Sequence, residues 1–352
     1  MTDLAVAPAR RYPFAMPYGW FQVCYPDDLA VGETKALYYF GTHLVAWRDE
    51  AGDAHVMDAF CPHLGAHLGH GGSVDGCELV CPFHGWKFDA EGANTDIPYS
   101  DRINRKARIR TYPTVERNGL TLVWYHPDEA PPMWEVAEVT ELSTGEFSGP
   151  KRTDHIVQAG IQELAENQVD SAHFRYVHNT ATVPENEKYE LDGHVAVMRS
   201  VQKFPTPRGV VDGRIDNDSD GPGLGTVRFS GIVDTLLVTG STPIDAETTQ
   251  VRFNFYVRSL GDEKTNSSVG AAFAAEVDRQ FEEDTPIWEH KAHLVRPALA
   301  DNDGPFMKFR KWYSQFYAEP VSDERTVFPP PYWPEKMAET PAKATASAKH
   351  GG

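Results

Sequence analysis

The sequence predicts an α+β protein built from two successive domains, and three observations support that prediction. Residues 18–126 consist largely of short strand-like segments separated by turn dipeptides. A stretch rich in proline and acidic residues, 127–132, then interrupts this pattern and is typical of a domain boundary. The remaining chain mixes a long series of strands with helical segments, which favours one antiparallel sheet wrapped by helices.

The first region is expected to form a small antiparallel β domain at residues 18–126, preceded by an N-terminal arm at residues 1–17. Its strand-like segments are rich in β-branched and aromatic residues, and turn pairs such as Asn118-Gly119 separate them. Loops between such strands can hold functional side chains at their tips. The expected strands are Gly19–Tyr25, Ala36–Phe40, Leu44–Arg48, His55–Ala59 and Leu120–Trp124.

The second region is expected to form a domain at residues 127–333, followed by a disordered tail at 334–352 that is poor in apolar residues. Helical sequence surrounds Gln158–Val177, strands dominate His194–Leu260, and further helices are expected over Gly270–Glu283 and Phe306–Tyr317. The last of these carries aromatic residues at helical spacing, so they are expected to pack against the sheet. They are Phe309, Trp312, Tyr313, Phe316 and Tyr317.

Composition excludes several classes of protein. The chain has 352 residues, 41% hydrophobic and 24% charged, with a formal net charge of −18, which argues against nucleic acid or an anionic membrane as partner. No apolar run is long enough to span a membrane, and the N-terminus lacks an apolar signal core, so a cytoplasmic location is expected. Cys24 and Cys77 are then expected to be free thiols, with Cys77 packed in the interior.

The most informative motif is a Cys-x-His pair, Cys61 and His63, followed by a Cys-x-x-His pair, Cys81 and His84. A Rieske [2Fe–2S] cluster needs these four ligands, because one iron takes both cysteines and the other takes both histidines. Each pair has a proline beside its cysteine and a glycine after it, as expected where backbone N–H groups crowd the sulfurs. A structural zinc site uses the same ligand types, but the two matched loops favour the cluster.

A second motif, Asp170-x-x-His173-x-x-x-x-His178, carries two imidazoles and a carboxylate. Two histidines and a later carboxylate form the facial triad that holds non-haem Fe(II) and leaves positions open for O₂. On a helix Asp170 and His173 share a face, whereas His173 and His178 point in different directions. For both histidines to bind one iron, the helix must end, break or bulge near residues 174–177. Alone, the pattern also fits ordinary packing or surface histidines.

With both motifs in place, the chain resembles the terminal oxygenase subunits of the Rieske non-haem iron oxygenases. The resemblance implies a helix-grip-like catalytic domain, one Rieske cluster and one mononuclear Fe(II) per chain, with His173 and His178 as iron ligands. It implies that Asp284, in an acid-rich helix, is the third ligand and that Asn167 lies near the iron. It also implies a homotrimer in which Asp170 bridges to the cluster ligand His84 of a neighbouring chain.

Two blocks resemble the branch of this family that acts on steroids. They are the Rieske segment CPHLGAHLGHGG with CPFHGWKFD, and Ile287–Lys291 followed by GPFMKFRKWYSQFY. Both are similar to the oxygenase component of 3-ketosteroid 9α-hydroxylase and to the cholesterol 7-desaturases, which implies hydroxylation or desaturation of a steroid or sterol-like substrate. The polar segment Thr182–Lys188 is less apolar than a sterol pocket requires.

Two alternatives remain open at this point. One is a Rieske oxygenase that acts on an aromatic ring or aryl ether, and the other is a Rieske protein that only transfers electrons. For an oxygenase, the partners are O₂, a small hydrophobic substrate and a separate NAD(P)H-dependent reductase, possibly with a ferredoxin. A separate reductase is expected because no strand is followed by the Gly-x-Gly-x-x-Gly signature of dinucleotide binding.

Overall fold

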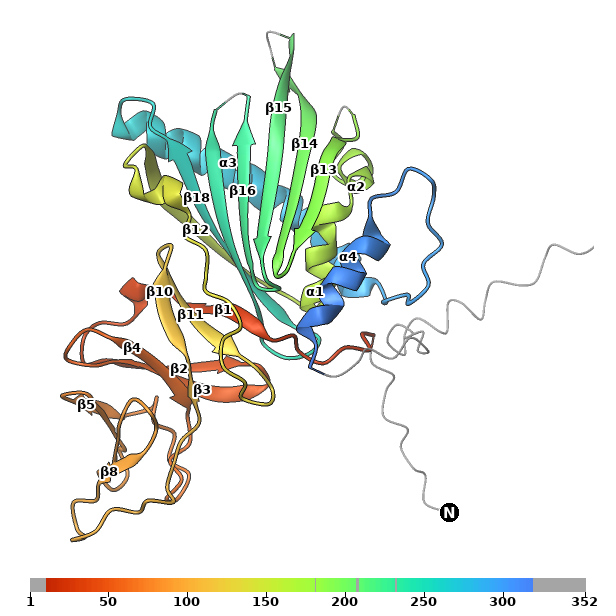
Figure 1. The fold of residues 1–352 in the computed structure, drawn as a ribbon. Helices are drawn as coiled ribbons and strands as arrows, with labels where there is room; N and C mark the ends of the chain where they lie inside the picture. The colour runs from red at the N-terminus through yellow and green to blue at the C-terminus, as the bar shows by residue number, and fades with distance from the viewer. Residues whose placement is uncertain (1–10, 181, 207–208, 232, 319–352) are drawn as a thin grey trace, which may run out of the picture.

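The computed structural model describes residues 11–180, 182–206, 209–231 and 233–318, and it confirms the α+β class (Figure 1). The sheets are antiparallel throughout. Residues 319–352, which include the expected tail, lie outside the described residues, as do residues 1–10 of the expected arm. The described part of the arm is packed, since Tyr12 and Phe14 are buried against the core of the second domain.

The first domain contains three small sheets. Their strand orders are β1-β11-β10, β2-β3-β4-β9 and β5-β6-β7-β8. The strands are β1 Gly19–Cys24, β2 Thr34–Tyr39, β3 Thr42–Arg48, β4 Ala54–Asp58, β5 Ser73–Asp75, β6 Glu78–Val80, β7 Lys87–Phe88, β8 Asn94–Asp96, β9 Thr111–Tyr112, β10 Thr114–Arg117 and β11 Leu120–Tyr125, with a 3₁₀ turn at Pro26–Asp28. The β5–β8 sheet lies at the end of this domain farthest from the helix α2 of the second domain (Figure 1). Buried Trp47, Met57, Leu79 and Phe88 form the core beneath that sheet.

The second domain is one sheet of seven strands in the order β12-β18-β17-β16-β15-β14-β13. The strands are β12 Phe147–Val157, β13 Glu185–Asp192, β14 Val195–Thr206, β15 Gly209–Asp220, β16 Leu224–Ser230, β17 Thr235–Pro243 and β18 Thr249–Arg258. The helices are α1 Ile161–Ala165, α2 Ala172–Tyr176, α3 Glu263–His290 and α4 Phe306–Tyr313, with 3₁₀ turns η2 Thr140–Ser143, η3 Glu166–Val169 and η4 Ser314–Phe316. The long helix α3 packs across β12 and β18 (Figure 1).

The helical sequence expected around Gln158–Val177 forms three short helical segments and not one continuous helix. Strand β12 extends to Val157, and the segment after it folds as α1, η3 and α2, with Asp170 in an extended conformation between the last two. Polar side chains in this segment compete with the helix for backbone groups, and Asp170 Oδ1 accepts from the His173 N–H at 3.2 Å. Asp170 and His173 therefore do not share a helix face, yet they remain in contact.

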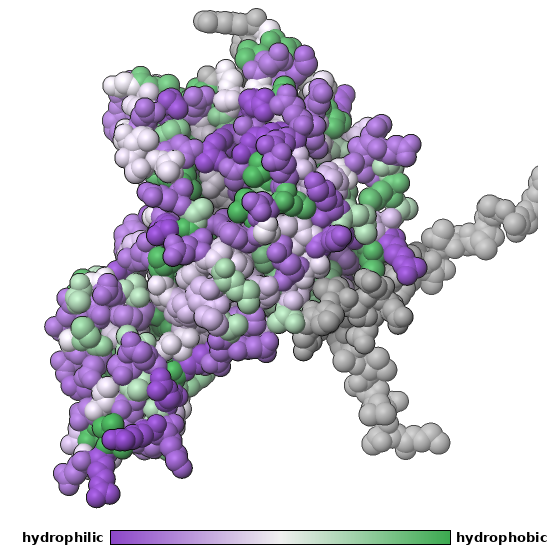
Figure 2. All heavy atoms as spheres, in the orientation of Figure 1, coloured by the Kyte–Doolittle hydropathy of each residue, from purple (hydrophilic) through white to green (hydrophobic). Residues whose placement is uncertain are grey.

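The expectation for Cys77 is also wrong, because Cys77 is exposed, although it and the buried Cys24 are both free thiols. The aromatic residues near the C-terminus are buried as expected, with Phe309 and Tyr313 at 0% exposure. Figure 2 shows a largely hydrophilic surface on which apolar side chains form small separate groups. Within the described residues, none of the helices is both long and apolar enough to span a membrane.

Hydrogen bonds fix the two domains to one another. The N–H groups of Phe40 and Gly41 donate to the carbonyls of Pro243 and Ile244 at 2.9 and 2.8 Å. Arg252, buried on β18, donates to the Gln22 carbonyl at 3.0 Å. Because these bonds join β1 and the β2–β3 turn to β17 and β18, the cluster loops are held away from the helical side of the second domain.

Candidate functional site

The four residues predicted as cluster ligands converge from two loops of the first domain. Cys61 and His63 lie between β4 and β5, and Cys81 and His84 lie between β6 and β7. The loops are built alike: in each, the cysteine N–H donates to the carbonyl five residues later, and the cysteine carbonyl accepts from a glycine N–H. These glycines, Gly65 and Gly85, have φ of 77° and 71°, which only glycine adopts without strain.

The arrangement of these side chains fits a Rieske cluster. The two cysteines are 2% exposed, and the rings of His63 and His84 have centroids 4.7 Å apart. Both Nδ1 atoms are buried without a hydrogen-bond partner, which is costly unless another group binds them. Burial and the adjacent Cys81 raise the pKa of the Cys61 thiol to about 11, so a nearby cation is needed to hold the thiolate.

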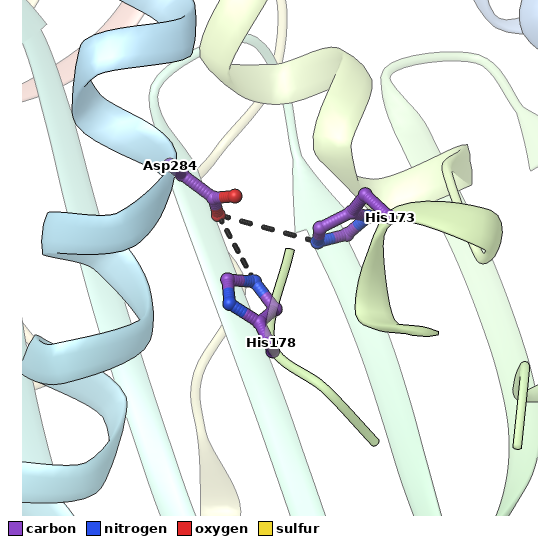
Figure 3. Close-up of side chains that lie close together, drawn as sticks. All are labelled: His173, His178 and Asp284. Atoms are coloured by element: carbon purple, nitrogen blue, oxygen red, sulfur yellow. Dashed lines mark ion pairs between the residues drawn. The ribbon is translucent and has the colours of Figure 1, made fainter. Parts of the chain in front are cut away.

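A second convergence of ligand-type atoms lies in the other domain (Figure 3). His173 lies on α2, His178 follows the end of that helix, and Asp284 comes from α3. The Asp284 Oδ2 atom is 3.4 Å from His178 Nε2 and 4.0 Å from His173 Nε2. Helix α2 ends at Tyr176, between His173 and His178, and both imidazoles reach Asp284. The five-residue spacing of the two histidines predicted such an end of the helix. The set of two imidazoles and one carboxylate suits non-haem Fe(II).

Neighbouring side chains orient these three residues. Asn167 Nδ2 donates to Asp284 Oδ2 at 3.2 Å and lies 3.2 Å from His173 Nε2. His178 Nδ1 is 3.0 Å from Glu283 Oε2, which leaves Nε2 facing Asp284. Burial would lower the pKa of His178, but the carboxylates of Asp284 and Glu283 outweigh it and raise the pKa. Such outer hydrogen bonds fix the ring orientation of metal ligands.

Sequence reasoning placed Asn167 near this site but missed Glu283. The available signal was the run of acids Glu282-Glu283-Asp284. On a helix these three side chains point in different directions, and that direction decides which of them reaches the site. Asp284 is buried, Glu283 is half-buried beside His178, and Glu282 is exposed. The assigned roles of all nine predicted site residues stay predictions.

A cavity of about 790 Å³ opens beside His173, His178 and Asp284, between α3 and the sheet. Its walls are mainly apolar and include Leu237, Phe253, Phe273, Phe281 and Trp288. Three of the aromatic residues expected to pack against the sheet, Phe309, Trp312 and Tyr313, do so and also line the cavity. Of the polar segment Thr182–Lys188, only Pro184 and Asn186 reach the wall, so the segment contributes little to its polarity.

A second group of carboxylates and a histidine lies apart from this cavity, but its charges are already balanced. Glu163, Glu166 and His293 are all buried and close enough to share an ion. However, Lys291 Nζ is 2.6 Å from Glu163 Oε2, and Arg310 pairs with both oxygens of Glu166. Two cations thus match two carboxylates, so we interpret the group as a structural ion-pair network.

We expect Glu163→Gln to lower the free energy of unfolding at neutral pH by about 3–5 kcal/mol, because it leaves Lys291 and His293 without their buried partner. Burial would raise the pKa of Glu163, but His293 and Lys291 outweigh it and hold the pKa at about 2. Since this pKa is depressed on folding, the stabilisation is present above about pH 4.5 and is lost toward pH 2. Urea titrations should therefore show a difference from the unmodified protein that shrinks on acidification.

The exposed Glu138 provides a control for this prediction, because Glu138→Gln removes the same charge from the surface. It should leave the urea midpoint almost unchanged across the pH range. A Glu163→Gln variant that is as stable as Glu138→Gln at neutral pH would contradict a structural role for the network.

Comparison with protein families matches both parts of the chain. Residues 19–113 match the Rieske [2Fe-2S] domain, and residues 123–317 match the 3-ketosteroid 9alpha-hydroxylase C-terminal domain. Among curated relatives, a cholesterol 7-desaturase of Caenorhabditis elegans is 34% identical over 87% of this chain and 78% of its own. A 3-ketosteroid-9-alpha-monooxygenase oxygenase component of Rhodococcus rhodochrous is 31% identical over 87% of this chain and 85% of its own.

Solved structures share the fold at lower identity. Apo dicamba monooxygenase superimposes with a TM-score of 0.67 at 18% identity, covering 86% of this chain and 97% of that one. NdmA of Pseudomonas putida CBB5 with caffeine gives a TM-score of 0.66 at 20% identity, covering 88% of this chain and 97% of that one. At these identities the likeness establishes the arrangement of the two domains.

Proposed function

Because the chain belongs to the Rieske oxygenases that carry the 3-ketosteroid 9α-hydroxylase C-terminal domain, we propose that it is the terminal oxygenase of a multi-component steroid or sterol monooxygenase or desaturase. The observation that supports this most directly is the position of His173, His178 and Asp284 at one end of a cavity with apolar walls. The two curated relatives described above are named for cholesterol and 3-ketosteroids, which favours a polycyclic substrate over an aryl ether.

In this proposal, Cys61 and Cys81 hold one iron of the cluster, and His63 and His84 hold the other. A bound Rieske cluster supplies electrons singly at a potential raised by its imidazole ligands. The two histidines are half-buried, so their outer edges are accessible to an electron donor. We place the docking site of a separate NAD(P)H-dependent reductase, with or without a ferredoxin, at this face.

His173, His178 and Asp284 would hold the mononuclear Fe(II), which supplies open positions for O₂ activation when bound. Asn167 holds the Asp284 carboxylate, and Glu283 accepts a hydrogen bond from His178 Nδ1 so that Nε2 faces the metal position. Phe281 and Trp288 exclude water from the adjoining cavity wall and present an apolar surface to the substrate. These residues position the reacting carbon; an oxygen atom is inserted there or two hydrogens are removed.

We further propose that the working unit is a homotrimer. The β5–β8 end of the first domain and helix α2 lie at opposite ends of one chain (Figure 1), and the interdomain hydrogen bonds hold them apart. Electrons from the cluster would therefore reach Asp170 from a neighbouring chain rather than from the same one. The side chain of Asp170 is 34% exposed, so it is accessible to such a neighbour.

A single-turnover assay tests the proposed function without the cognate reductase. The purified protein, with iron measured, is reduced chemically, mixed with 3-ketosteroids, sterols and aryl ethers, and exposed to O₂. We expect a steroid or sterol product that has gained one oxygen or lost two hydrogens, and iron at three atoms per chain. Conversion of only an aryl ether would contradict the steroid assignment, and iron at two atoms per chain would favour a protein that only transfers electrons.

A further inference from the structure

The cavity is long, and its two ends differ in chemistry. Pocket-lining residues recur along one face of α3 from Val269 to Asp284, a distance of about 22 Å at the rise of an α-helix. The helix follows β18, since Phe273 packs on Phe255 and Phe281 packs on Phe253 at ring distances of 5.7 and 5.2 Å. The predicted metal ligands are therefore at one end of the cavity, and the wall near Val269 is at the other.

Phe281 and Trp288 line the end near the metal position, whereas the far end combines apolar residues such as Phe229 with two buried polar side chains. Thr235 on β17 lies in register with Phe229, Ile215 and Ser200 across the sheet, and Gln202 lies two residues beyond Ser200 along β14. Gln202 and Thr235 both line the cavity, and each is 4% exposed. We call these two polar side chains, which lie on the far part of the sheet wall, the far subsite.

Two polar atoms of the far subsite are buried and have no partner within the described part of the chain. Neither Gln202 Oε1 nor Thr235 Oγ1 has a hydrogen bond, although the neighbouring Ser200 hydroxyl donates to the Ile215 carbonyl at 2.9 Å. Buried polar side chains are nearly always satisfied, and an unsatisfied one is destabilising. An amide oxygen accepts and a hydroxyl can donate or accept, so both suit an oxygen-bearing group of a ligand.

We propose that the far subsite binds an oxygen at the end of the substrate remote from the carbon that reacts. This inference rests on the proposed function. It assigns the substrate to elongated steroids with a hydroxyl or carbonyl group near the end of the side chain. Gln202 on β14 can accept a hydrogen bond from such a hydroxyl, and Thr235, three strands away on β17 of the same sheet, can donate to such an oxygen. Both are specificity-determining residues outside the metal site.

The length of the cavity decides which end of a steroid lies there. Ser219 marks the end of the cavity near the metal position, because its hydroxyl donates at 3.0 Å to Gln168, the neighbour of Asn167 in the chain. Ser219 pairs with Ala196 on β14, and Gln202 lies six residues further along that strand. The distance from Ala196 to Gln202 is therefore about 20 Å in extended chain. The contact between the reacting carbon and the metal position and the hydrogen bond to Gln202 together take up roughly 7 Å. About 13 Å then remains between the reacting carbon and the remote oxygen of the substrate. The relatives are named for reactions at positions 7 and 9, which both lie in ring B, and the oxygen of ring A is too close to ring B to span this gap. A path from ring B across rings C and D into the side chain spans it.

The test compares two ligands that differ by one oxygen, cholest-4-en-3-one and 25-hydroxycholest-4-en-3-one. Binding to the iron-loaded protein is followed by tryptophan fluorescence, because Trp288 and Trp312 line the cavity. Single-turnover product is measured for the same pair. The unmodified protein should bind the hydroxylated ligand about tenfold more tightly than its analogue, as one hydrogen bond to a buried partner provides.

Gln202→Leu and Thr235→Val remove the polar atoms and keep the approximate volume. Each should weaken binding of the hydroxylated ligand toward that of the analogue and leave the analogue's affinity unchanged, which also shows that the variant is folded. Ser200→Ala is the matched control, because its hydroxyl is already bonded to the strand, and it should keep the full preference. Loss of preference in only one variant assigns the subsite to that residue.

The outcomes separate this inference from the proposed function. If the unmodified protein converts both ligands but binds them equally, or if both variants keep the preference, the far subsite is wrong and the steroid function stands. If the unmodified protein converts neither of these ligands nor any other steroid in the panel, the proposed function itself fails, and the inference fails with it.

Discussion

Replacement of Asp284 by alanine is expected to abolish turnover and to remove the mononuclear iron while leaving the Rieske cluster in place. Asp284 supplies the single carboxylate among the three converging donors, and its Oδ2 lies 3.4 Å from His178 Nε2. The residue is buried, with only 6% exposure, so water replaces the lost ligand poorly. Even loss of an outer-sphere partner typically costs about 10–100-fold in metal affinity, and loss of a ligand should cost more than about 100-fold.

Iron content and spectroscopy measure this effect directly. The variant should fall from three irons per chain to two, while the visible and electron paramagnetic resonance spectra of the cluster stay unchanged. Glu282→Ala is the matched control, because Glu282 is an exposed acid two residues away on the same helix. It should retain all three irons. A variant lacking Asp284 that still held the third iron and turned over substrate would show that another residue completes the site.

This site illustrates why sequence reasoning reached some residues more easily than others. The cluster ligands and the two histidines lie close together in the chain, so their spacing alone indicates which atoms can meet. Asp284 lies more than a hundred residues downstream, in a helix with several other acids. Its selection needed the family resemblance, and the structure distinguishes it physically: Asp278 on the same helix bonds Thr153 and His155 instead.

Other features depended on tertiary structure and were beyond reach of the sequence. Glu283 becomes a partner of His178 only because α3 crosses the end of α2, a contact that no local pattern encodes. The cavity likewise arises from six strands, β13 to β18, and from helices that lie far apart in the sequence, including α3 and α4. Conversely, the helical segment after β12 is broken at Asp170, which is extended and whose side chain accepts a hydrogen bond from the His173 N–H. That interruption places a carboxylate at the surface beside the predicted metal ligands.

Asp170→Ala is expected to leave both iron sites occupied and yet reduce turnover by about 100-fold, the upper end of the cost of losing an outer partner of a metal ligand. Asp170 is not one of the three converging donors, so removing it spares the metal ligands. It is nevertheless bound to His173: its Oδ1 accepts from the His173 N–H, and its carbonyl pairs with His173 Nδ1. Burial would raise the pKa of Asp170, but His173 outweighs it and lowers the pKa, so the side chain is a carboxylate at neutral pH.

An ionised acceptor that contacts His173 and is also partly exposed can receive a hydrogen bond from the cluster histidine of a neighbouring chain, which makes it the expected path for electrons. Stopped-flow reoxidation of the reduced cluster, with substrate and O₂ present, measures this step. The rate should collapse in Asp170→Ala while iron stays at three per chain. Asp170→Asn keeps the shape and an acceptor oxygen but not the charge, so an intermediate rate would attribute part of the effect to charge. Unchanged reoxidation in the alanine variant would mean that electrons take another route.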